Sequence, residues 1–258
     1  MEIERVSWNE IGPEFLKRWG MPKGKFEAEH LAILGPTGSG KSFFMTHVLK
    51  ERARLRGSHI VIIATKPADK TMTNLGWPIS QKWPPNYDQP QVIFWPKAGS
   101  IKQSLERQRL AILDMLDELW KPNANIIVSF DEISYIEDEL KLSTQIRRYW
   151  RESRALGISL VATTQRPFRV GRTMWSEASW KVAFRPTDEE DGKRVAQVLG
   201  SQKLYFETLM NDLQRNEFII IHRDSRQAYI SKIPNLKSTS SGSTPGTKPS
   251  NTPKTSQN

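Results

Sequence analysis

Short apolar runs alternate with longer amphipathic segments along most of this chain. The runs are rich in β-branched residues and are bounded by polar or glycine-containing stretches, which is typical of buried parallel strands. Strands of this kind are predicted at residues 31–34, 59–64, 91–95, 126–130, 159–163 and 180–184. Strands that alternate with helices predict the α/β class, in which helices flank a mainly parallel sheet.

The segments between the apolar runs carry apolar residues at helical spacing. Leu113, Leu116 and Trp120, for example, fall on one face of a helix. Helices are predicted at residues 11–19, 43–56, 100–120, 140–156, 187–199 and 203–213. Thr187 and Glu190 predict a capping box at the start of the fifth of these helices.

The last third of the chain ends in two further patterns. The apolar runs 217–222 and 227–233 flank a short polar stretch and predict a C-terminal β-hairpin. From residue 238 onward proline is the one apolar residue type, and Ser, Thr and Pro dominate, which predicts disorder. We therefore expect one domain over residues 1–236 and a disordered Ser/Thr/Pro-rich tail over 237–258. Residues 65–90 predict a long loop.

The stretch GPTGSGKS at residues 35–42 matches the phosphate-binding pattern G-x-x-x-x-G-K-[ST] at every fixed position. A predicted strand precedes it and a predicted helix follows, so backbone N–H groups and the helix dipole converge on one point. A glycine-rich turn without a ligand is the alternative, and these flanking elements argue against it. We expect ATP binding by Gly35, Pro36, Thr37, Gly38, Ser39, Gly40, Lys41 and Ser42, with Lys41 on the β- and γ-phosphates and Ser42 on Mg²⁺.

Polar residues follow two of the later predicted strands. Asp131 and Glu132 end the run 126–130. Downstream of a phosphate loop, this pair predicts a Mg²⁺ contact through water for Asp131 and a general base in Glu132. An ordinary pair of strand-end carboxylates is the alternative. Gln165, after the next predicted strand, is expected to contact the γ-phosphate or the attacking water.

Composition narrows the class of protein further. The net charge of +10 suits a polyanionic partner, such as nucleic acid or a membrane surface. The sequence contains no cysteine, which excludes disulfides, cysteine-ligated zinc and thiol catalysis, and the four histidines lack metal-ligand spacing. Since no apolar run is long enough to cross a bilayer, we expect a cytoplasmic protein without direct membrane insertion.

The segment RESRALGISLVATTQRP, residues 151–167, resembles the stretch that follows the acidic strand in the HerA–FtsK superfamily of DNA-pumping ATPases. The matching positions are Arg154, Ala155, Gly157, Ile158, Leu160, Thr164, Gln165, Arg166 and Pro167. With the phosphate loop and the acidic pair, the resemblance covers most of residues 31–185. It implies a P-loop NTPase of the RecA/ASCE type and a homo-oligomeric ring, typically a hexamer. It also implies translocation of double-stranded DNA, or in some branches of single strands or proteins.

Differences between this chain and individual members of the superfamily favour one function over the others. The FtsK membrane spans and winged helix and the HerA barrel have no counterpart here, so the chain is more similar to genome-packaging ATPases of membrane-containing phages and archaeal viruses. We expect an ATP-hydrolysing DNA translocase in the host cytoplasm or virion, with a capsid or membrane protein as a further partner. A conjugative coupling ATPase and a nucleotide-dependent assembly switch are the alternatives.

The resemblance also implies an arginine that reaches the nucleotide of the adjacent subunit. Arg154 is the expected residue, because it lies just before the predicted strand that carries Gln165. Such an arginine stabilises charge in the transition state of phosphoryl transfer. Arg147, Arg151 and Arg172 are rival candidates.

Overall fold

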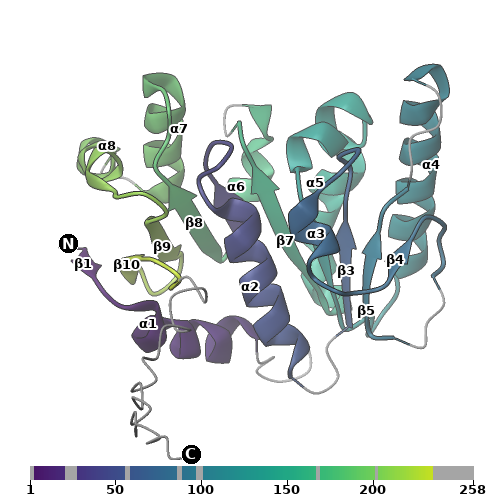
Figure 1. Cartoon of the computed structure of the whole chain (residues 1–258), viewed down its shortest axis with the longest axis horizontal. Coiled ribbons are helices and arrows are strands. Elements are labelled where there is room, and N and C mark those ends of the chain that lie inside the picture. The colour runs from purple at the N-terminus through teal and green to yellow at the C-terminus, as the bar shows by residue number, and fades with distance from the viewer. Residues whose placement is uncertain are drawn as a thin grey trace, which may run out of the picture.

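The computed structural model describes residues 3–20, 28–55, 59–85, 89–96, 101–166, 169–200 and 203–234 (Figure 1). The predicted tail, residues 237–258, lies outside this part of the chain, and the single domain over residues 1–236 stays a prediction. The strands are β1 (Glu4–Arg5), β2 (Leu31–Leu34), β3 (His59–Ile63), β4 (Ile79–Ser80), β5 (Gln91–Phe94), β6 (Ile126–Phe130), β7 (Ile158–Thr164), β8 (Trp180–Phe184), β9 (Phe218–His222) and β10 (Ala228–Ser231).

All of these strands form one sheet in the order β1-β10-β9-β8-β2-β7-β6-β3-β5-β4. From β8 to β4, every neighbouring pair is parallel. The hairpin of β9 and β10 is antiparallel within itself, and β9 is antiparallel to β8. The predicted α/β class, mainly parallel with a C-terminal hairpin, is therefore confirmed. One strand, β7, separates the phosphate-loop strand β2 from the acidic strand β6.

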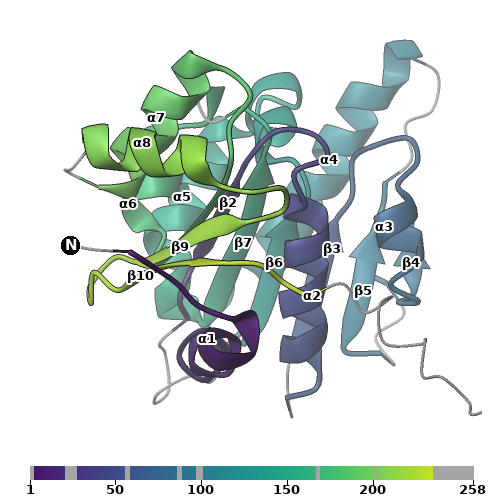
Figure 2. The same ribbon diagram turned by 60° about the vertical axis from the view of Figure 1, so that its left-hand side comes forward.

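Helices cover both faces of this sheet (Figures 1 and 2). They are α1 (Trp8–Phe15), α2 (Lys41–Ala53), α3 (Lys70–Thr73), α4 (Ile101–Leu119), α5 (Ser143–Glu152), α6 (Arg172–Glu177), α7 (Glu189–Leu199) and α8 (Lys203–Asp212). Side chains alternate between the faces of a strand, so both faces of a parallel sheet need apolar residues. In β2, Leu31 and Ile33 pack in the core with α1 and α2. Ala32 and Leu34 pack in a second core with α4, α5 and α7.

The predicted helix over 140–156 is interrupted. Lys141 has φ +55°, a left-handed conformation that an α-helix cannot contain. The structure has a π-helix, Tyr135–Glu139, before this residue, then α5, and then a 3₁₀ helix, Ser153–Leu156. The predicted continuous helix was therefore wrong at both ends.

Two smaller predictions also fail. The N-cap of α7 is Asp188, whose carboxylate accepts from the Asp191 N–H at 2.8 Å, so the capping box from Thr187 was wrong. Residues 65–90 are not a plain loop, because they contain α3 and the two-residue strand β4. Elements of two to four residues are too short for their apolar residues to form a periodic pattern from which a helix or a strand could be predicted.

Candidate active site

The phosphate-loop sequence lies between β2 and α2, where it turns at the carboxyl edge of the sheet. Gly35 has no room for a side chain, since a Cβ there would lie 2.7 Å from the Cβ of Phe184. Gly40 has φ +109°, which favours glycine over other residues. Ser39 Oγ is buried without a hydrogen-bond partner among the described residues. This arrangement fits a cradle for phosphate oxygens.

Lys41 is the first residue of α2 and is 6% exposed. Its ammonium donates to the carbonyl of Pro36 at 2.7 Å. The Lys41 side chain therefore folds back over the phosphate loop. Burial lowers the pKa of Lys41 to about 8, although Glu132 and Asp131 act in the opposite direction. The ammonium is therefore mostly charged at neutral pH and is incompletely paired, as a phosphate ligand needs.

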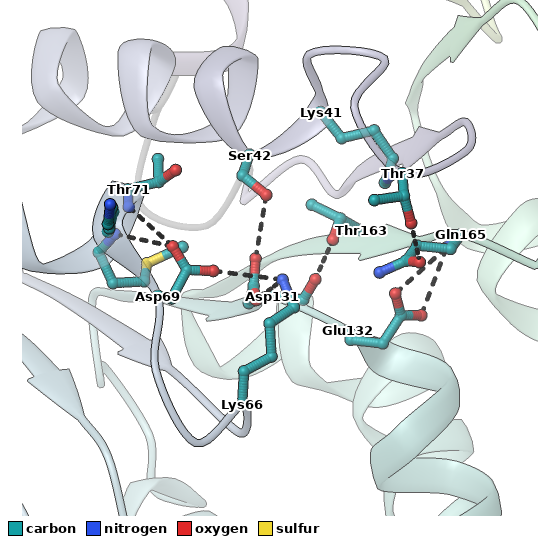
Figure 3. A network of polar contacts seen from close by, with 12 residues as sticks. Thr37, Lys41, Ser42, Lys66, Asp69, Thr71, Asp131, Glu132, Thr163 and Gln165 are labelled. Carbon is teal, nitrogen blue, oxygen red and sulfur yellow. Dashed lines mark hydrogen bonds and ion pairs between the residues drawn. The ribbon is translucent and has the colours of Figure 1, made fainter.

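Asp131 is at the end of β6 and is 2% exposed. One carboxylate oxygen accepts from Ser42 Oγ at 3.3 Å, and the other pairs with Lys66 Nζ at 2.6 Å (Figure 3). The hydroxyl of Thr163 on β7 donates to the backbone carbonyl of Asp131. The oxygens of Ser42 and Asp131 are ligands that suit Mg²⁺, and the Lys66 ammonium already places a cation against them.

Lys66 and its partner Asp69 belong to no motif and were not predicted from the sequence. Lys66 follows β3 and pairs with Asp69 at 3.2 Å, and Asp69 caps α3 by accepting from the Thr71 N–H at 2.8 Å. Ligand-binding residues in open α/β sheets gather at the carboxyl ends of strands. This rule, applied to the end of β3 beside the end of β6, could have predicted Lys66.

Glu132 and Gln165 lie on the other side of Asp131. The Glu132 carboxylate accepts from the Gln165 backbone N–H at 3.2 Å and from the Ser134 hydroxyl at 2.7 Å. The Gln165 side-chain oxygen accepts from the Thr37 hydroxyl at 2.5 Å (Figure 3). Gln165 therefore connects the phosphate loop to the predicted base. The fold brings Thr37, Lys41, Ser42, Asp131, Glu132 and Gln165 to one edge of the sheet.

Arg154 does not lie at this edge. It is in the 3₁₀ helix that precedes β7, whereas Gln165 follows β7, and the seven residues of that strand span about 23 Å. The rivals Arg147 and Arg151 are exposed on α5, and Arg172 begins α6. An arginine acting on an adjacent subunit therefore stays a prediction.

A family model described as the central domain of helicase HerA matches residues 25–63, which contain β2, the phosphate loop, α2 and β3. The chain resembles the P-loop ATPases of the HerA–FtsK superfamily. The resemblance seen in the sequence is thereby confirmed, and so is the predicted enzyme class, a P-loop ATPase. No curated protein matches the chain.

Solved structures with the same fold agree with this resemblance. The DNA-packaging ATPase B204 from Sulfolobus turreted icosahedral virus matches with a TM-score of 0.60 and 15% identity, over 80% of this chain and 98% of B204. The cytoplasmic domain of the type VII secretion ATPase EccC from Thermomonospora curvata matches with a TM-score of 0.59 and 12% identity, over 80% of this chain and 25% of that chain. The conjugation coupling protein TcpA of pCW3 matches with a TM-score of 0.50 and 18% identity, over 78% of this chain and 60% of that chain.

The described residues contain neither a membrane-spanning helix nor a cluster of metal-binding side chains. None of the described helices is long and apolar enough to span a membrane. Within the same part of the chain, no three His, Asp or Glu side chains cluster as a metal site.

Proposed function

We propose that this chain hydrolyses ATP to translocate DNA, as the motor of a viral or mobile-element packaging system. The observation that carries the proposal is the match to the DNA-packaging ATPase B204, which extends over 98% of that protein. The matches to EccC and TcpA cover smaller shares of those chains. The net charge of +10 supports a polyanionic partner.

In the proposed reaction, Glu132 accepts a proton from a water molecule whose oxygen attacks the γ-phosphorus of ATP in line. The bond from the γ-phosphorus to the β–γ bridging oxygen breaks, and ADP leaves with that electron pair. The Lys41 ammonium stabilises negative charge on the phosphate oxygens. Ser42 and Asp131 would hold Mg²⁺, which neutralises charge on the β- and γ-phosphates when bound.

Lys66 provides a test of the metal site. In the structure its ammonium is the counter-ion of Asp131, with Nζ 2.6 Å from Oδ2. A Lys66→Met variant leaves a nearly inaccessible carboxylate without this partner, which destabilises the folded state. We expect a lower thermal unfolding temperature in the absence of Mg²⁺. We also expect Mg²⁺ alone to raise that temperature more than in the wild type, because an ion that binds only the folded state stabilises it.

The control for this measurement is Lys70→Met, which removes an exposed lysine from the neighbouring helix α3. It should unfold like the wild type with and without Mg²⁺. An equal Mg²⁺ response in Lys66→Met and the wild type would show that Asp131 is not the metal ligand.

The proposed motor acts as a homo-oligomeric ring, with a hexamer as the expected form and the host cytoplasm or virion as its place. In a ring, Arg154 of one subunit would approach the nucleotide of the next, which accounts for its distance from the phosphate loop of its own chain. A capsid or membrane protein would hold the ring against its substrate.

Translocation predicts that double-stranded DNA stimulates ATP turnover. We expect turnover to rise when a duplex of unrelated sequence is added, and particle size in the same samples to report assembly. Since no base-reading element is evident, DNA affinity should fall steeply with salt and depend little on sequence. If DNA at low salt neither binds the protein nor changes the rate of ATP turnover, that result would contradict translocation and favour a nucleotide-dependent assembly switch.

The likeness to TcpA supports a second candidate, a conjugative coupling ATPase that acts with a membrane partner. Both candidates predict DNA-stimulated turnover, so a different experiment separates them. Copurification with a capsid protein would support packaging, whereas copurification with a secretion-channel protein would support conjugation.

A further inference from the structure

A second cavity lies away from the phosphate loop, between α6, β8 and α7. It has a volume of about 510 Å³ and is lined by Arg172, Trp175, Ser176, Lys181, Arg194, Gln197 and Val198. Figure 2 shows α6 and α7 close together at this end of the molecule. We call it the α6–α7 cavity. It shares no lining residue with the groove beside the phosphate loop, which includes Thr37 and Gln165.

The α6–α7 cavity is also on the other face of the sheet from α2. Lys181 is paired with Ala32 in the β2–β8 ladder, and paired residues point to the same face. Ala32 belongs to the core that contains α4, α5 and α7, whereas α2 packs on the opposite face. A ligand in this cavity therefore does not occupy the nucleotide site.

The lining of the cavity is cationic and has no carboxylate. Three of its residues, Arg172, Lys181 and Arg194, carry positive charge, and every other lining residue except Val198 has a polar donor. Two of the donors lack acceptors. Arg194 Nε and the indole N–H of Trp175 are buried and have no hydrogen-bond partner in the described part of the chain, and Trp175 is 4% exposed.

Lys181 lies in surroundings that disfavour its positive charge. Burial lowers the pKa of Lys181, and the nearby positive charge of Arg223 lowers it further. The Lys181 ammonium donates to the carbonyl of Val198 at 2.7 Å, which is a neutral partner. Three cationic side chains line the cavity and no carboxylate does, so the lining favours an anionic ligand.

We propose that the α6–α7 cavity binds a phosphate group of the DNA backbone. Phosphate suits the site because it accepts several hydrogen bonds and its negative charge offsets the positive charge of the three cationic side chains. Arginine binds phosphate through the planar set of N–H donors on its guanidinium group. DNA is the source that the proposed function provides, and the inference rests on that function. Contacts of this kind fix the position of a protein on DNA without reading its sequence.

The test measures binding of a short fluorescent duplex to protein saturated with a non-hydrolysable ATP analogue, over a range of salt concentrations. Arg194→Gln and Lys181→Met should each weaken binding about tenfold at low salt. Each should also reduce the slope of log affinity against log salt by about 0.9, since one phosphate contact is lost. The control is Arg107→Gln, an exposed position on α4 that removes the same charge far from the cavity and should leave the slope almost unchanged.

The outcomes separate the cavity from the proposed function. If wild-type protein binds no DNA, the proposed translocase fails. If wild type binds and Arg194→Gln and Lys181→Met match Arg107→Gln, the cavity inference alone fails. Basal ATP turnover of Arg194→Gln should equal that of the wild type, which also reports correct folding. A calorimetric signal for inorganic phosphate that Arg194→Gln abolishes, with DNA binding intact, would assign the cavity to free phosphate and overturn the DNA assignment.

Discussion

Lys41→Ala is expected to abolish ATP hydrolysis and to weaken ATP binding sharply. The Lys41 ammonium is buried at the start of α2 and donates to the carbonyl of Pro36, so it is placed to exchange that contact for phosphate oxygens. Loss of one donor to developing negative charge lowers turnover by about 10²- to 10³-fold in other enzymes, and a charged donor contributes at the upper end. Steady-state phosphate release and equilibrium binding of a fluorescent ATP analogue measure the two effects.

Lys50→Ala is the matched control, because Lys50 is an exposed lysine in the last turn of the same helix. It should keep both turnover and nucleotide affinity. Normal turnover in Lys41→Ala would end the P-loop ATPase interpretation, whatever the DNA experiments give.

Glu132→Gln is expected to separate binding from chemistry. The amide keeps an oxygen that can accept from the Gln165 N–H and the Ser134 hydroxyl, so the local structure should persist. It cannot take a proton from water, and a positioned general base contributes about 10²- to 10⁴-fold to rate. We expect ATP to bind with near wild-type affinity and turnover to fall at least about 100-fold, as single-turnover hydrolysis of radiolabelled ATP would show.

An exposed residue in the same segment controls for the loss of one carboxylate. Glu139→Gln, in the π-helix that follows β6, should turn over ATP like the wild type. Should Glu132→Gln retain full turnover, Glu132 is not the general base.

The sequence predicted the central strands well because they are buried on both faces and therefore apolar throughout. The phosphate loop was predicted because its motif directly follows the apolar run of β2. Asp131 was predicted because it directly follows the apolar run of β6. Lys66 was not, since its role depends on β3 lying next to β6, a neighbour relation that no local pattern encodes. The break at Lys141 was also missed, because a left-handed lysine has no sequence signal comparable with glycine.

The interrupted helix also limited the interpretation of the arginines. On a continuous helix Arg147, Arg151 and Arg154 would share one face, because residues three and four apart are neighbours on a helix. In the structure Arg154 belongs to the 3₁₀ helix, where the angle between successive residues differs from that of α5. Which of these arginines meets a neighbouring subunit depends on an interface that a single sequence does not encode.

The hydrogen bond between Thr37 and Gln165 has a mechanical consequence. Gln165 begins the segment that leads to α6, and it is anchored on one side by the phosphate loop and on the other by Glu132. A γ-phosphate that draws the Thr37 hydroxyl away removes one of these two anchors. The occupancy of the nucleotide site is then coupled to the contacts that hold Gln165 at the end of β7.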